Sequence, residues 1–142
     1  MEERRDALRQ HAAAAALIGA LGAGLLASSP GAAACELPPG KRLASGNVAL
    51  TYRIVPAKVA VGEHFEVHFA ACLGASAVVS GQIRADAHMP EHRHGMNYRP
   101  SIAASGAAGA FRSQGWLFHM AGRWEFVFEI GGERLTDSVR VE

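Results

Sequence analysis

The stretch EHFEVHFAAC, residues 63–72, decides the class of fold. Its apolar residues Phe65, Val67 and Phe69 alternate with polar residues, and a strand with one buried and one wet face requires that period of two. The segment RWEFVFEI, residues 123–130, repeats the alternation with aromatic residues of its own. Both segments are therefore predicted to be β-strands that turn one face toward a core.

Further strands are expected around these two. Shorter alternating runs predict strands at 48–54, 81–88, 99–104, 109–113, 115–119 and 134–141. Turn-forming glycine pairs separate some of them, and no helical stripe of useful length follows residue 34. Seven or so short strands in about 100 residues predict an all-β, immunoglobulin-like antiparallel β-sandwich, since each sheet must bury its apolar face against the other.

Composition limits the class of function. The 142 residues suffice for one domain and a targeting segment. Fourteen Lys and Arg against thirteen Asp and Glu leave a formal charge of +1 without a basic run, so nucleic-acid binding is not expected. The sequence has no G-x-S-x-G, no phosphate loop, no C-x-x-C-H and no carboxylate pair suited to acid–base chemistry. We predict that the protein is not an enzyme.

The first 34 residues differ in character from the rest. A charged start, MEERRDALRQH, precedes sixteen Ala, Gly, Leu and Ile residues at 12–27. This pattern is typical of a signal peptide, and it is short of the roughly 20 apolar residues of a bilayer span. The Arg4-Arg5 pair also resembles a twin-arginine export signal. We predict a signal peptide at 1–34 and a periplasmic or secreted domain at 35–142, with an uncleaved membrane anchor as the alternative.

Cleavage at that point would leave two cysteines, Cys35 and Cys72, in an oxidising compartment where such pairs usually close. We predict one disulfide between them, and a loop of that length constrains the unfolded chain by about 3–4 kcal/mol in the chain-entropy model. The alternative is a lipoprotein acylated on Cys35. It ranks second because the Ala-Ala-Ala before the cysteine lacks the leucine usually found three positions upstream.

The segment HMPEHRHGMNYRP, residues 88–100, gathers three histidines and two methionines. His92, His94 and Met96 lie two apart, so in an extended segment they project to one side, and His88 shares their parity. Imidazole and thioether suit copper in its cuprous state, whereas zinc rarely takes methionine. We predict that this segment binds copper as Cu(I), with zinc the less favoured ion.

Other donors could join from the segment FHMAGRWEF, residues 118–126, if strands ending near 88 and 119 open at the same edge. Met89 and Met120 continue the apolar faces of their strands, so filling the core is an alternative role for both. The predicted metal ligands are His88, His92, His94, Met96 and His119, with Met89 and Met120 ranked below them. The competing interpretation is a turn with surface histidines and no metal.

Three further histidine or cysteine patterns receive a different interpretation. The letters HMPEH spell the H-x-x-E-H zinc-protease motif, but Pro90 and Gly95 oppose the helix which that motif needs. A blue-copper site needs a cysteine thiolate, which a disulfide at Cys72 would remove. His64 and His68 lie on the polar face of the strand at 63–72, and we expect them to be solvated.

Two segments, AHMPEHRHGM at 87–96 and GWLFHMAGRWEFVFEI at 115–130, resemble the YtkA-like and FixH-like family of small extracytoplasmic domains. Members of this family show a Met-Pro pair and a His- or Met-bearing Gly loop, then an aromatic, Met, Gly and Trp segment that leads into a strand. The resemblance implies an immunoglobulin-like sandwich outside the cytoplasmic membrane. It also implies an association with copper handling or respiratory-oxidase assembly.

The sequence therefore predicts a periplasmic or secreted copper-binding protein that acts as a carrier, a buffer or an assembly accessory. Its partners would be the copper ion and a copper-delivery or membrane protein. The alternative belongs to another class: a metal-free interaction module that docks on a membrane or a respiratory-oxidase partner. In that case Tyr98, Trp116 and Trp124 are the candidate anchors.

Overall fold

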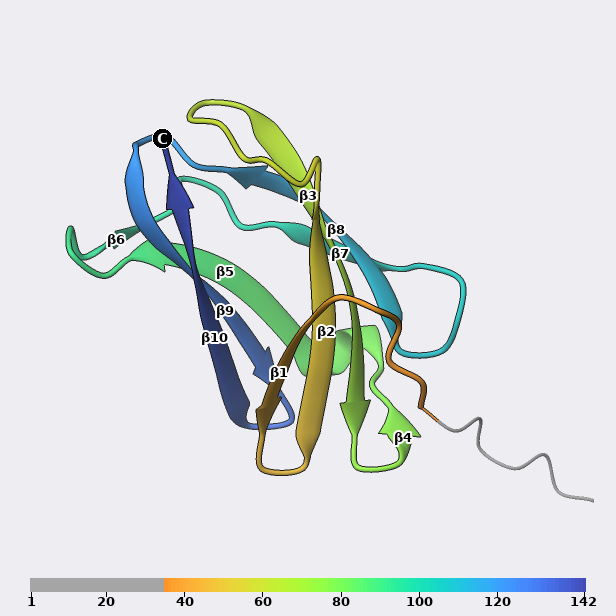
Figure 1. Ribbon diagram of the computed structural model, residues 1–142. Helices are drawn as coiled ribbons and strands as arrows, with labels where there is room; N and C mark the ends of the chain where they lie inside the picture. The colour runs from red at the N-terminus through yellow and green to blue at the C-terminus, as the bar shows by residue number, and fades with distance from the viewer. Residues whose placement is uncertain (1–34) are drawn as a thin grey trace, which may run out of the picture.

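The computed structural model describes residues 35–142, whose strands form two antiparallel sheets packed face to face (Figure 1). The larger sheet contains, in spatial order, β1 (Lys41–Ser45), β2 (Val48–Val55), β3 (His64–Leu73), β8 (Ala110–Leu117) and β7 (Ser101–Ala104), and β4 (Ser76–Ala77) pairs with β3. The smaller sheet contains β10 (Glu133–Val141), β9 (Gly122–Ile130), β5 (Ile83–Met89) and β6 (His94–Gly95). A short 3-10 helix, η1 (Ser80–Gln82), precedes β5.

This architecture confirms the predicted all-β sandwich, whereas the signal peptide expected at 1–34 lies outside the described residues. The segments 109–113 and 115–119, expected as two strands, correspond to the single strand β8, which ends at Leu117. That strand continues through Gly115, at a φ of 88°, opposite a register shift between Phe65 and Val67. The strands β1, β4 and β6 were not among those expected from the sequence. They form by pairing with a neighbouring strand and have no alternating pattern of their own.

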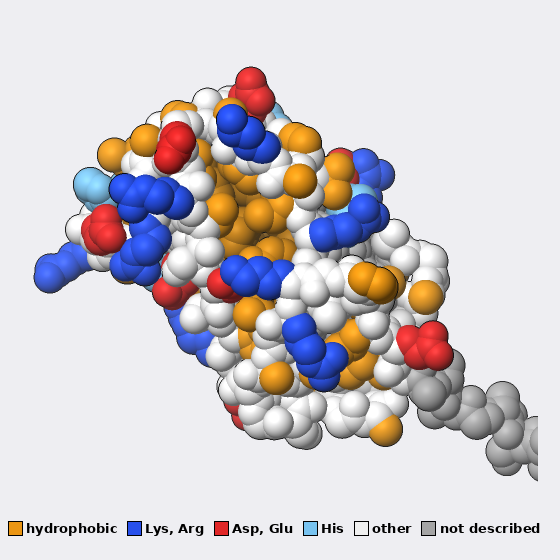
Figure 2. Space-filling view, viewed as in Figure 1, with side chains coloured by type: hydrophobic (Ala, Val, Ile, Leu, Met, Phe, Trp, Pro, Cys, Tyr) orange, Lys and Arg blue, Asp and Glu red, His pale blue; other side chains and the backbone are white. Residues whose placement is uncertain are grey.

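The core lies between the sheets and is built from alternate residues of the strands. On β3, Phe65 and Phe69 are buried, and on β9 the same holds for Phe126 and Phe128. Aromatic rings meet across the two layers, as between Phe69 and Phe128, whose centres are 5.5 Å apart. In the face viewed in Figure 2, apolar side chains show through a central hollow flanked by Lys and Arg. Within residues 35–142, no helix is long and apolar enough to cross a membrane.

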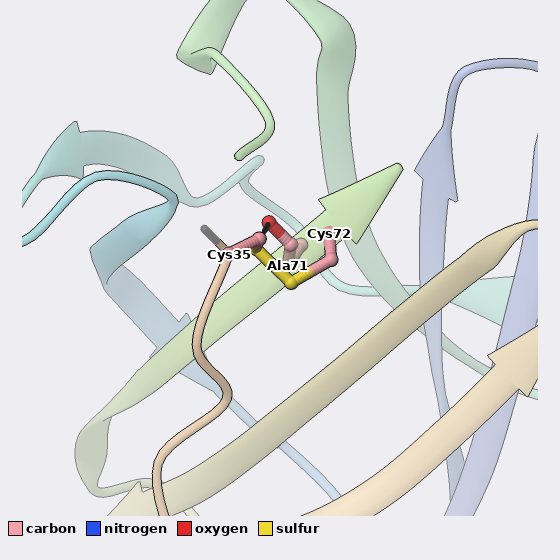
Figure 3. The surroundings of a disulfide bond; sticks show 3 residues. All are labelled: Cys35, Ala71 and Cys72. Carbon is pink, nitrogen blue, oxygen red and sulfur yellow. Dashed lines mark hydrogen bonds between the residues drawn. A yellow bond between two sulfur atoms is a disulfide. The ribbon is translucent and has the colours of Figure 1, made fainter. Parts of the chain in front are cut away.

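Cys35 and Cys72 form a disulfide, as the sequence predicted (Figure 3). Their Cα atoms are 5.7 Å apart. The backbone N–H of Cys35 also donates a hydrogen bond of 3.3 Å to the carbonyl of Ala75. The Cys35 Sγ lies 3.4 Å from the carbonyl oxygen of Ala71, and because a disulfide sulfur carries no hydrogen this is a packing contact. The bond ties the segment before β1 to the end of β3.

Removal of this disulfide is expected to destabilise the fold. The bond closes a loop with a sequence separation of 37 residues. The double variant Cys35→Ser, Cys72→Ser should therefore lose roughly 3–4 kcal/mol of unfolding free energy, because its unfolded chain is freer. Urea denaturation at neutral pH measures the difference from the oxidised protein. A loss below about 1 kcal/mol would contradict this account.

A partly buried polar contact links the two sheets at the edge where β1 lies beside β10. Tyr52 on β2 is 5 % exposed, and its hydroxyl donates a hydrogen bond to the carboxylate of Asp137 on β10. The Lys41 ammonium lies 2.5 Å from the same carboxylate. Burial raises the pKa of Tyr52 far above its ordinary value of 10.0, and the hydrogen bond and negative charge of Asp137 raise it further.

This raised pKa predicts a loss of stability in alkali. Stability linked to Tyr52 is fully present below about pH 10 and falls as the pH rises above it, because the unfolded chain releases a proton that the folded chain keeps. The expected slope is about 1.4 kcal/mol per pH unit. Tyr52→Phe should remove this slope in urea unfolding between about pH 10 and 11.5, whereas Tyr98→Phe should retain it. An unchanged slope in Tyr52→Phe would refute the assignment.

Candidate metal centre

The segment at 88–100, expected to form a loop, begins as a hairpin between β5 and β6. The chain reverses at 90–93, where the backbone N–H groups of His92 and Arg93 both donate to the carbonyl of Met89. Arg93 takes a φ of 56° in this turn. The returning strand then places His94 opposite Met89. His94 is thus held by strand pairing, whereas His92 is exposed on the turn.

The same reversal separates His88 from the other histidines. Cross-strand partners share one face of a sheet, so His94 shares the inner face with Met89, and His88 occupies the outer face. There the His88 Nε2 lies 3.5 Å from a carboxylate oxygen of Glu125. The sequence predicted that His88 projects to the same side as His92 and His94. That prediction fails because side-chain alternation holds only along an uninterrupted strand, and the turn at 90–93 interrupts it. The structure therefore does not bring His88 into the cluster.

His119 lies in the turn between β8 and β9, and its ring packs beside that of His94. The two ring centres are 5.1 Å apart with an angle of 33° between the planes. The ring of His92 follows at 5.8 Å from His94. Two imidazoles that bind one ion through bonds of about 2 Å have ring centres about 5 Å apart. The spacing of His94 and His119 thus suits a shared ion, with His92 on the solvent side.

Trp124 lies against both of these rings. Its ring centre is 5.8 Å from that of His94 and 5.4 Å from that of His119, at steep interplanar angles of 69° and 78°. The indole is fully buried, and its Nε1 donates a hydrogen bond of 3.0 Å to the carbonyl of Met120. Phe118 stacks on it with ring centres 4.4 Å apart. Trp124 therefore fixes the turn that carries His119 and contacts His94 as well.

The two adjacent imidazoles differ in their hydrogen bonding. The His94 Nδ1 lies 3.3 Å from the carbonyl of Gly95, a contact that suits the tautomer with its proton on Nδ1 and a lone pair on Nε2. The His119 Nδ1 is buried and has no hydrogen-bond partner in the described part of the chain. Burial of an unpaired polar atom costs free energy. A bound cation is one group that can satisfy such a nitrogen.

The methionines divide between the core and its margin. Met89 is fully buried, as expected for a residue that fills the core. Met96 and Met120 are half-buried and pack against the core, so Met96 has a packing role that the sequence did not indicate. The Met96 N–H also extends the hairpin through a hydrogen bond of 3.2 Å to the carbonyl of Ala87. The two half-buried thioethers belong to the segments that carry His94 and His119.

Residues 35–142 contain no group of three or more His, Cys, Asp or Glu side chains arranged to hold a metal ion. The pair His94 and His119 supplies two nitrogen donors, and the thioethers of Met96 and Met120 are the sulfur donors on the same two segments. Zinc rarely accepts that donor set, whereas cuprous copper does. The H-x-x-E-H pattern forms no helix, because residues 88–92 comprise the end of β5 and the following turn.

The remaining histidines and the candidate docking residues lie elsewhere. His64 is exposed, and His68 contacts the carboxylate of Glu66 at 2.8 Å. Trp116 and Trp124 are fully buried in the core. The prediction that they could serve as docking anchors is therefore wrong. Of the three proposed anchors only Tyr98, which is 72 % exposed, is accessible.

An ion-pair network occupies the outer face of β3, away from the histidine cluster. The Arg112 guanidinium donates two hydrogen bonds, of 2.5 and 2.6 Å, to the carboxylate of Glu66. This contact, together with those from His68 and Gln114, holds the pKa of Glu66 well below its usual range. Such exposed pairs are ordinary surface interactions, and we assign them no binding role.

Comparison with known proteins gives no functional assignment. No family model matches the sequence, and no curated protein or solved structure matches it significantly. The resemblance to the YtkA-like and FixH-like family stays a prediction from the segments at 87–96 and 115–130. Any functional proposal therefore depends on the fold and on the geometry of the histidine cluster.

Gly122, at the start of β9, leaves the space that Met89 occupies next to the cluster. Its φ is +131°, and a Cβ at this position would lie 2.6 Å from the Met89 Cε. Gly122→Ala should therefore lower the unfolding free energy by about 2 kcal/mol, through both backbone strain and overpacking. Urea denaturation measures the loss.

Two matched variants separate these causes. Met89→Leu in the Gly122→Ala background removes the Cε and should recover part of the loss, because only the overpacking is relieved. Gly62→Ala carries backbone strain alone, since Gly62 has a φ of +78° and nothing within 4 Å of the added Cβ. If Gly122→Ala were no more destabilising than Gly62→Ala, the contact with Met89 would be unimportant.

Proposed function

We propose that the protein binds a cuprous ion at the end of the sandwich where β6 meets the β8–β9 turn. His94 and His119 supply two imidazoles, and the thioethers of Met96 and Met120 supply sulfur. The observation that carries this proposal is the packing of the two imidazole rings at 5.1 Å beside a buried His119 nitrogen that has no hydrogen-bond partner among residues 35–142. The exposed His92, 5.8 Å from His94, is placed to meet an incoming ion first.

The choice of copper follows from the available donors. Both cysteines of the chain are consumed by the disulfide, so thioether is the sulfur that the protein can offer. Thioether and neutral imidazole are soft and borderline ligands that need no deprotonated thiol, and they favour Cu(I) over zinc. They also remain usable in an oxidising compartment, where the disulfide persists.

We further propose that this binding takes place in the periplasm or outside the cell, with the protein acting as a carrier, buffer or assembly accessory. The signal-like composition of residues 12–27 and the disulfide between Cys35 and Cys72 support that location. A role in transport requires that the ion can leave, and His92, which is exposed at the margin of the cluster, gives it a route to a partner. The partner would be a copper-delivery or membrane protein.

The test is anaerobic titration of the full-length protein with Cu(I) against a competing chelator. One equivalent should bind. The variants His94→Ala and His119→Ala should each weaken affinity by more than about tenfold, because changes to outer partners of metal ligands alone cost that much. His92→Ala should slow uptake more than it lowers affinity, since that ring is exposed at the margin.

His64→Ala and His88→Ala serve as controls, because each removes an imidazole that lies outside the cluster. Both should bind copper as the unaltered protein does. The proposal is refuted if His94→Ala and His119→Ala retain full affinity, or if the controls lose as much as they do. Circular dichroism of each variant shows whether a loss of binding comes from a loss of fold.

A further inference from the structure

A groove of about 530 Å³ lies between β5 of the smaller sheet and residues 99–102, which include the start of β7 of the larger one. Both of its ends are bounded by the chain itself. At one end the Met96 N–H donates a hydrogen bond to the carbonyl of Ala87, and at the other end β7 lies against η1. A groove of this volume that is bounded at both ends suits a small molecule.

One wall of the groove carries a backbone donor without a partner. Groups of alternate residues face the same edge of an antiparallel strand, so the Ala85 N–H points to the same side as the Ala87 carbonyl. On that side, β6 pairs with no residue of β5 before His88. Among residues 35–142 the Ala85 N–H therefore has no partner, although the residue is only 8 % exposed. Such a donor needs an acceptor from solvent or from a ligand.

Two arginines line the groove without an ion pair to a carboxylate of the described chain. Arg84 belongs to β5, and Arg99 comes from the opposite wall. The two negative side chains at the groove already have partners. Glu129 pairs with Arg134 at 3.2 Å, and the carboxylate of Asp86 accepts a backbone hydrogen bond of 2.8 Å. The groove therefore carries positive charge that an anion can balance.

Much of the remaining lining is apolar. It consists of Ile83, Ala85, Ala87, Pro100, Ile102 and Val127. An inorganic anion would leave this surface uncovered, whereas a ligand with an apolar body removes it from water. A guanidinium matches the planar carboxylate, to which it can donate two parallel hydrogen bonds. Charge and apolar lining together favour an organic carboxylate.

We propose that this groove binds a small organic carboxylate whose apolar body is the size of one or two rings. Its carboxylate is held by the guanidinium groups of Arg84 and Arg99, and its body lies on the apolar lining beside Ala85. The site is separate from the candidate metal centre, because neither His94 nor His119 lines the groove. Binding here requires no metal.

Titration of the ¹⁵N-labelled full-length protein with naphthoate, followed by amide NMR, tests the inference. The amide signal of Ala85 should shift with a dissociation constant on the order of 1 mM or lower, as a ligand of this size allows. Naphthamide has the same rings without the charge and should bind about tenfold more weakly or worse. Inorganic phosphate in about tenfold excess should not displace naphthoate, because it cannot cover the apolar lining.

Two variants test the role of the arginines. Arg84→Gln and Arg99→Gln should each weaken naphthoate binding about fivefold or more, because each removes a charged donor from the groove. Arg42→Gln makes the same change on β1, at an edge of the other sheet, and should bind as the unaltered protein does. Circular dichroism of each variant shows whether the fold is intact.

The inference is overturned if the Ala85 amide signal stays in place up to about 10 mM naphthoate. It is also overturned if naphthamide binds as tightly as naphthoate, if phosphate displaces naphthoate, or if both arginine variants keep full affinity. Copper is omitted from these measurements, so the result stands apart from that of the copper titration.

Discussion

The stack of Phe118 on Trp124 is the contact on which the candidate metal centre depends. Phe118 follows β8 of the larger sheet and Trp124 belongs to β9 of the smaller one, so their rings, 4.4 Å apart and within 13° of parallel, join the two sheets at this end. Because the indole is fully buried and its Nε1 is bonded to the Met120 carbonyl, the intervening turn is held in place, and His119 with it. Strand pairing opposite Met89 then brings His94 to the same indole. The proposed copper ligands are thus positioned by the core and by strand pairing.

The layered architecture could be predicted because the side-chain alternation that determines it is a local property of the sequence. The alternation at 63–72 and 123–130 places one set of residues on a buried face, and the structure confirms this for both strands. The disulfide could be predicted from the number of cysteines together with the expected export of the domain. The strands β1 and β6 could not be found in this way, since they exist through pairing with β2 and β5. A two-residue strand such as β6 carries no periodic signal at all.

The candidate site was less accessible to sequence reasoning, and for a related reason. Residue types are the basis of the proposed chemistry, because thioether and imidazole are donors that a soft metal accepts. Which side chains converge depends on two turns. The turn at 90–93 places His88 on the far face of the sheet, and the turn before β9 brings His119 to His94. Trp124 was recognised as a β-strand residue, but nothing in the sequence indicated that its indole would contact both imidazoles.

The most direct test of the account is long-range ¹H–¹⁵N NMR of the histidine side chains during anaerobic addition of Cu(I), a closed-shell ion that leaves the signals sharp. One equivalent should shift the signals of the ring nitrogens of His94 and His119 together, while those of His64, His68 and His88 should stay at their original positions. Uniform small shifts across all the histidines, or a response confined to His92, would show that the ion does not share the two packed imidazoles.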